Sequence, residues 1–161
     1  MSNFPNLNNP SHLIATLGGV GNAKYAPGTF GSFVSLILFV IFSHYINMEW
    51  IILGITFYAI WLCDKISKDL IEKDHKAIVI DELVGMWIAA YPAIYLSTQN
   101  QRVLYAVLAF IFFRLFDILK PFPISYIDQN LKGGMGIVLD DVVAGIFAAI
   151  ISTLLMNLIF V

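Results

Sequence analysis

The chain has 161 residues, of which 59% are hydrophobic and only 12% charged. Soluble globular chains carry roughly 25% charged residues, so this composition argues against a soluble domain and predicts an integral membrane protein. The formal net charge of −2 and the lack of any Lys/Arg run argue against nucleic-acid binding. The length favours one membrane-embedded domain over residues 1–161, and nothing in the sequence predicts an obligate protein partner.

Five apolar stretches follow one another along the chain and predict an all-α, polytopic helical bundle. They cover approximately residues 30–46, 50–63, 83–96, 103–119 and 137–161. Several are shorter than the roughly 20 residues that an upright membrane span needs. Tilt or local thinning of the bilayer would have to compensate for the difference. The sequence therefore predicts four to five transmembrane helices.

The basic residues predict the orientation of this bundle, because cytoplasmic loops retain Lys and Arg. With five spans, eight of the nine basic residues fall on one side and only Arg102 falls on the other. This split places the N-terminus and the loops at about 64–81 and 120–136 in the cytoplasm. Among the acidic residues only Glu49 falls outside, so we expect the functional site at the cytoplasmic leaflet.

Two adjacent acidic pairs, Asp81-Glu82 and Asp140-Asp141, stand where apolar stretches begin on the cytoplasmic side. One pair alone would be explained by the positive end of a helix dipole, which favours carboxylates. Two pairs on one side of a bundle repel each other near hydrocarbon unless a cation neutralises them. Hard oxygen ligands without nearby cysteine favour Mg²⁺, Mn²⁺ or Ca²⁺ over structural zinc. We therefore predict a metal site formed by Asp81, Glu82, Asp140 and Asp141.

The two acidic pairs also lie in similar surroundings. Residues 78–85 and 137–144 align without gaps, and both lead into stretches that contain Ala-Ala. A duplicated parallel unit would explain this similarity. Chance convergence of two membrane helices of similar composition explains it equally well, so the internal repeat is one of two interpretations.

A second group of charges lies at the end of the fourth apolar stretch. Arg114 and Asp117 are three residues apart and can meet on one helix face. One interpretation is an ion pair, with Lys120 extending toward the membrane surface. The other is that Arg114 and Lys120 bind a phosphate while Asp117 orients one of them or completes a metal shell. Pro121 and Pro123 are expected to end the helix.

Two glycine-rich segments, at residues 18–32 and 132–136, do not fit the P-loop pattern. Glycines can expose backbone N–H groups to anionic oxygens, and either Thr29 or Ser32 could lie at a helix N-terminus, which favours phosphate. On this interpretation Lys24 and Gly134 also belong to a phosphate site. Flexible hinges or close helix packing explain the same glycines equally well.

Taken together, these motifs resemble the phosphatidylglycerophosphatase A family over nearly the whole chain. The similarity rests on residues 26–32, on Asp74-His75 with residues 81–87, on residues 113–123 and on residues 133–145. The resemblance implies a Mg²⁺-dependent lipid phosphatase of the bacterial inner membrane, multi-pass, with its active site on the cytoplasmic side. Such an enzyme hydrolyses phosphatidylglycerophosphate to phosphatidylglycerol and inorganic phosphate, the last step of phosphatidylglycerol biosynthesis.

The resemblance and the charge pattern together give each candidate residue an expected role. The expected catalytic residues are Asp81, Asp140, Asp141, Arg114 and Asp117. The expected phosphate-binding residues are Lys24, Thr29, Arg114, Lys120 and Gly134. The attacking group is either a metal-activated water or one of the paired aspartates, and the sequence does not choose between them.

Two other functions stay open at this point. A CDP-alcohol phosphotransferase also uses acidic residues at cytoplasmic helix ends, but its DGxxAR-type opening is missing here. A small membrane transporter could also bury carboxylates, although transporter charges tend to lie near the bilayer midplane rather than at one boundary.

Overall fold

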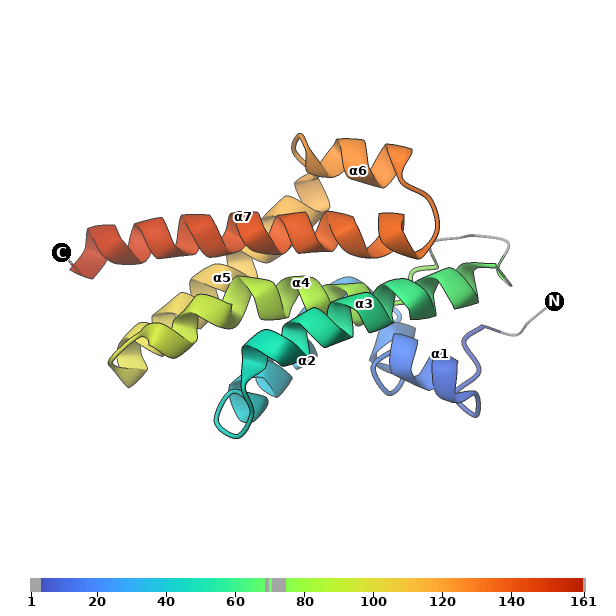
Figure 1. Cartoon of the computed structure of the whole chain (residues 1–161), viewed down its shortest axis with the longest axis horizontal. Coiled ribbons are helices and arrows are strands. Elements are labelled where there is room, and N and C mark those ends of the chain that lie inside the picture. The colour runs from blue at the N-terminus through green and yellow to red at the C-terminus, as the bar shows by residue number, and fades with distance from the viewer. Residues whose placement is uncertain (1–3, 69, 71–74, 161) are drawn as a thin grey trace.

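The computed structural model describes residues 4–68, 70 and 75–160, in which helices joined by turns and loops are the only regular secondary structure (Figure 1). It contains seven α-helices and two short 3₁₀ helices, η1 and η2. In chain order these are α1 (Pro10–Ala15), η1 (Val20–Asn22), α2 (Pro27–Phe42), α3 (Met48–Ser67), α4 (Ile80–Ala90), η2 (Tyr91–Tyr95), α5 (Gln99–Leu119), α6 (Ile124–Asn130) and α7 (Gly134–Phe160). The prediction of an all-α fold is confirmed for these residues.

The long helices alternate in direction along the molecule (Figure 1). Helices α4 and α7 lie side by side and run the same way, whereas α3 and α5 run back. The short helices α1 and α6 lie at the end where α4 and α7 begin, and the C-terminus lies at the other end. The acidic pairs at the starts of α4 and α7 therefore share one end of the bundle.

Only α3 and α7, of the helices described, are long and apolar enough to cross a membrane by length and composition. Helix α2 is apolar but has 16 residues, and α4 has 11 before it continues as η2. Eleven residues of α-helix cover only about 17 Å, against about 30 Å of bilayer hydrocarbon. Helix α5 has 21 residues but carries polar side chains at both ends. The four to five spans predicted from the sequence are therefore not confirmed in number.

Local signals fix the ends of α5. At its start, the Thr98 hydroxyl accepts a hydrogen bond from the Gln101 N–H (3.3 Å), and the Gln101 side chain accepts one from the Thr98 N–H (3.2 Å). At its end, Lys120 has a left-handed backbone (φ 42°) and donates its N–H to the Phe116 carbonyl (2.8 Å). Pro121 follows directly, as expected for a helix end, and the chain turns back toward α7.

Helices α4 and α7 cross with their backbones in contact at Gly85 and Gly145. A Cβ atom at Gly145 would overlap the Gly85 carbonyl, and one at Gly85 would lie 2.6 Å from the Asp141 carbonyl oxygen. Only glycine permits this approach, as at close helix crossings in membranes. The crossing brings together the two similar segments, 78–85 and 137–144, although common ancestry of the two stays a prediction.

The N-terminal segment packs against the end of the bundle that carries the acidic pairs. Helix α1 contacts α3, and the Ala15 carbonyl accepts a hydrogen bond from the Val79 N–H (2.9 Å). Gly21 lies so close to the backbone of Ala77 that a Cβ atom there would overlap the Ala77 carbonyl. These contacts fix the short segment that leads into α4.

Candidate active site

A cleft of about 350 Å³ opens where α4 and α7 begin and α5 ends. The first turn of α2 forms another of its walls. Eight charged side chains of the described chain line the cleft: Asp81, Glu82, Asp117, Asp140, Asp141, Lys76, Arg114 and Lys120. This concentration of charge at one end of an apolar bundle marks the cleft as the candidate site.

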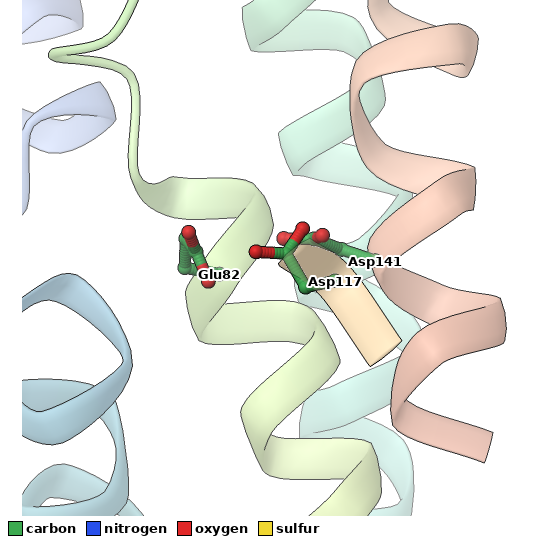
Figure 2. Close-up of side chains that lie close together, drawn as sticks. All are labelled: Glu82, Asp117 and Asp141. Atoms are coloured by element: carbon green, nitrogen blue, oxygen red, sulfur yellow. The ribbon is translucent and has the colours of Figure 1, made fainter. Parts of the chain in front are cut away.

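Three carboxylates from three helices converge in this cleft (Figure 2). Glu82 on α4, Asp117 on α5 and Asp141 on α7 each place one oxygen within 4.8 Å of the other two. We call these residues the acidic triad. Glu82 and Asp141 are 8% and 4% exposed, so neighbouring negative charges are poorly screened by water. The oxygen donors fit a hard divalent cation.

Arg114 holds two members of the acidic triad in place. Its Nη1 atom lies 2.5 Å from Glu82 Oε2 and 2.9 Å from Asp117 Oδ2. The expected ion pair between Arg114 and Asp117 is therefore present. Ser32 of α2 adds a hydrogen bond from its hydroxyl to the same Glu82 oxygen (2.8 Å). One oxygen of each carboxylate is thus engaged, and the orientation of both is fixed.

The first turn of α2 lies directly over Glu82. A Cβ atom at Gly28 would overlap Glu82 Oε1 and would lie 3.2 Å from Arg114 Nη2. Any other residue at Gly28 would displace one of these side chains. The sequence suggested hinges, helix packing or phosphate binding for this glycine-rich segment. The structure shows close approach of backbone to a carboxylate at Gly28, with Ser32 one turn later on the same helix face.

Lys120 forms a second ionic group beside the acidic triad. Its Nζ lies 2.6 Å from Asp128 Oδ1 on α6 and 2.8 Å from Asp140 Oδ2 on α7. Burial works against the charged form of Lys120, but the hydrogen bonds to Asp128 and Asp140 outweigh it and raise the pKa of Lys120. Lys120 therefore stays protonated and neutralises Asp140. The other oxygen of Asp140, Oδ1, is buried and has no hydrogen-bond partner within the described chain.

The structure separates the four acidic residues predicted as metal ligands. Glu82 and Asp141 belong to the acidic triad, and the third member is Asp117. Asp81 and Asp140 line the same cleft outside the triad. The Asp81 carboxylate accepts a hydrogen bond from the Glu82 N–H (3.0 Å).

The predicted phosphate-binding residues are also divided. Thr29, Arg114 and Lys120 line the cleft. Lys24 is not among the lining residues, and its Nζ lies 5.5 Å from the centre of the Tyr25 ring. Gly134 does not line the cleft either: it packs against α3 so closely that a Cβ atom would overlap the Ile60 carbonyl. For Gly134, the helix-packing interpretation therefore describes the structure.

The Asp74-His75 pair precedes α4, and only its histidine belongs to the described residues. Asp74 lies outside the described residues. His75 Nδ1 accepts a hydrogen bond from the Ala77 N–H (3.2 Å), and its ring contacts Phe4 edge-on, with ring centres 5.0 Å apart. His75 thus shapes the turn before α4. Lys76 is a cleft residue that motif reasoning missed, because a single loop lysine carries no spacing signal.

A larger cleft, about 420 Å³, lies at the opposite end between α2, η2 and α5. Its lining, as far as residues 4–68, 70 and 75–160 form it, is mainly apolar, with Arg102 as the one Lys or Arg and with no carboxylate. It therefore lacks the paired acids and bases that phosphate chemistry or metal binding would need.

Comparison with known proteins gives consistent results. The family profile described as Phosphatidylglycerophosphatase A matches residues 13–156. The chain is 42% identical over 151 residues to the phosphatidylglycerophosphatase A of Haemophilus influenzae, covering 89% of this chain and 86% of that protein. The chain is 36% identical over 149 residues to the phosphatidylglycerophosphatase A of Escherichia coli, covering 89% of this chain and 81% of that protein.

A third relative carries a different name. The chain is 33% identical over 146 residues to a Bacteroides thetaiotaomicron protein named "Putative phosphatidylinositol-3-phosphatase", covering 86% of this chain and 89% of that one. No solved structure matches the chain.

Proposed function

The chain belongs to the phosphatidylglycerophosphatase A family, and we propose that it hydrolyses phosphatidylglycerophosphate to phosphatidylglycerol and inorganic phosphate. The observation that carries this proposal is the acidic triad with Arg114 in a charged cleft at one end of an apolar bundle. A phosphate monoester on a lipid headgroup would reach such a cleft from the membrane surface, while its acyl chains stay in the bilayer.

We further propose that residues 1–161 form one domain in the bacterial inner membrane, with the cleft at the cytoplasmic leaflet. Helices α2, α3, α5, α7 and the continuous α4–η2 segment would be the five membrane-embedded elements. Large apolar side chains on their outer faces support this placement, among them Trp50 (71% exposed), Phe57 (66%) and Leu158 (79%). The basic residues of the cleft end and the lone Arg102 at the other end agree with the positive-inside rule.

The acidic triad fits Mg²⁺, since it offers clustered, buried oxygen donors with Arg114 as their only close cationic partner among the described residues. We propose that Glu82, Asp117 and Asp141 hold this ion, with Asp81 and Asp140 in reach on the cleft wall. When bound, Mg²⁺ would draw charge from the phosphoryl oxygens and lower the pKa of a coordinated water.

The residues of the chain supply orientation and proton handling. Arg114 keeps Glu82 and Asp117 aligned, and the absence of a side chain at Gly28 lets the first turn of α2 approach Glu82 closely. In hydrolysis a new P–O bond forms to water oxygen, the P–O bond to glycerol breaks, and the glycerol oxygen takes up a proton. Asp81 lines the cleft and is proposed to accept the proton from water. The rival route, attack by an aspartate carboxylate on phosphorus, would pass through a covalent aspartyl-phosphate, which acid quenching during turnover of phosphate-labelled substrate would trap; direct water attack would leave no labelled protein.

Removal of metal tests the proposal directly. Purified protein in detergent should release phosphate from phosphatidylglycerophosphate with Mg²⁺, lose this activity in excess EDTA, and regain it when Mg²⁺ is restored. The reason is that the acidic triad cannot neutralise substrate charge by itself. Undiminished release in EDTA would contradict the metal role, and no release by folded protein with either Mg²⁺ or Mn²⁺ would contradict the function.

Phosphatidylinositol 3-phosphate is the comparison substrate, because the Bacteroides relative is named for activity on it. We expect faster phosphate release from phosphatidylglycerophosphate, in line with the two relatives of higher identity. Faster phosphate release from the inositol lipid would contradict this expectation and would indicate that phosphatidylinositol 3-phosphate is the preferred substrate.

Replacing Arg114 by Lys should lower kcat/KM by about 10–100-fold, the usual effect of losing a residue that orients metal ligands. A lysine retains the charge but has one nitrogen instead of a planar fork, so it cannot hold Glu82 and Asp117 in the same geometry. The Mg²⁺ concentration for half-maximal activity should rise as well. Arg102→Lys, at the other end of the bundle, is the matched control, and an equal loss there would contradict this role.

A further inference from the structure

We infer that Lys76 binds the phosphate monoester of the substrate at the mouth of the cleft; this rests on the proposed function. Among the described residues, three basic side chains line the cleft: Lys76, Arg114 and Lys120. Arg114 and Lys120, which belong to the motif at residues 113–123, already form ion pairs with carboxylates. Arg114 pairs with Glu82 and Asp117, and Lys120 pairs with two aspartates of its own.

Lys76 differs from both. Its side chain is exposed and lines the cleft, and none of the ion pairs between described residues involves it. A flexible lysine with this exposure is a point charge that can follow an incoming phosphate. Of the described cations that line the cleft, Lys76 is therefore the one available to a ligand.

The backbone that carries Lys76 is nevertheless fixed. The three residues that follow it, Ala77, Ile78 and Val79, are 5%, 4% and 0% exposed. Val79 donates its N–H to the Ala15 carbonyl (2.9 Å), and Ala77 packs against Gly21. The lysine stem thus begins from an anchored segment at the rim of the cleft, and its range is limited to that rim.

The charge of the cleft explains why such a cation is needed. Five carboxylates and three basic groups of the described residues line it, so this part of the lining is net negative. One divalent cation on the acidic triad would only balance that excess, and a phosphate group brings further negative charge. The first turn of α2, with Gly28 and Thr29, lies on the same cleft and offers N–H groups that have no partner within the helix. A phosphate between this turn and Lys76 would meet favourable charge on both sides.

Substitution of Lys76 by Met removes the charge and keeps the length. We expect KM for phosphatidylglycerophosphate to rise about 10–100-fold, the scale of one lost charge-assisted hydrogen bond, while kcat changes by less than about 3-fold. Lys76→Arg should restore most of the affinity. Lys24→Met is the matched control, because Lys24 is a cation near the same end that does not line the cleft.

Inorganic phosphate separates a phosphate contact from any other lipid contact. Its inhibition constant, and its dissociation constant with Mg²⁺ measured by calorimetry, should rise by the same factor in Lys76→Met as KM does. An unchanged KM, a loss confined to kcat, or a KM increase without weaker inorganic phosphate binding would each overturn the inference. The calorimetric result stands even if no lipid substrate is turned over, whereas missing turnover by folded wild type contradicts the proposed function instead.

Discussion

Replacing Asp141 by Asn is expected to lower kcat/KM by about 10³-fold or more while the protein stays folded. Asp141 is 4% exposed and belongs to the acidic triad with Glu82 and Asp117. The amide keeps the size of the side chain but removes the charge that would hold a divalent cation. Loss of metal-based stabilisation worth about 4 kcal/mol corresponds to this factor. Steady-state phosphate release at saturating Mg²⁺ gives the rate constants.

In the absence of metal, the thermal stability of the Asp141→Asn variant should increase or stay unchanged. Removing one of three clustered carboxylates relieves repulsion in a poorly hydrated site, so the melting temperature of Asp141→Asn in EDTA should equal or exceed that of wild type. Asp128→Asn is the matched control, because Asp128 pairs with Lys120 without lining the cleft. Equal activity losses in both variants would contradict the assignment of the triad.

The positions of most long helices can be predicted from local signals in the sequence. Hydropathy locates five apolar stretches, each of which contains or overlaps one of the long helical elements. Pro121 marks the end of α5. The stretch at 83–96 was predicted as one helix, but α4 ends at Ala90 and a 3₁₀ helix follows. Pro92 explains this difference, since proline has no N–H to donate to the carbonyl four residues earlier and its ring crowds that carbonyl.

The choice between neighbouring acidic residues could not be predicted in the same way. Adjacent residues on a helix point about 100° apart, so one member of each pair faces the cleft centre, but the sequence does not say which. The rotation of α4 against α7 decides it, and the contact between Gly85 and Gly145 sets that rotation. This contact joins residues far apart in the chain, so local sequence patterns do not predict it.

The same reasoning applies to the lysines. Lys24 looked suitable because it lies in a glycine-rich segment, whereas Lys76 lies in a loop without a motif. The position of Lys76 at the cleft depends on Val79 bonding to Ala15 and on Gly21 packing against the backbone before α4. Both are long-range contacts, which only the folded chain reveals.

Replacing Gly145 by Leu should destabilise the protein by about 3 kcal/mol, the upper end of the usual cost of overpacking. The Cβ atom of the new side chain would overlap the Gly85 carbonyl. Because this carbonyl belongs to the backbone of α4, it cannot move aside as the end of a flexible side chain can. For a chain of this size the loss corresponds to a melting temperature lower by about 6–12 °C. Thermal unfolding in detergent, followed by size-exclusion chromatography, measures it. Gly145→Ala should show a smaller decrease, because its helix propensity offsets part of the strain.

Gly54→Leu is the control, since a Cβ atom at Gly54 on α3 meets no atom within 4 Å, and its effect should stay within roughly 0.5 kcal/mol. The Gly145 variants should also lose activity beyond what unfolding explains. The Asp141 carbonyl lies one turn before Gly145 and directly beside Gly85, so separating the two helices moves Asp141 away from Glu82. A folded Gly145→Ala protein with normal Mg²⁺ activation would mean that the triad tolerates this separation, and that the glycine contact does not set its geometry.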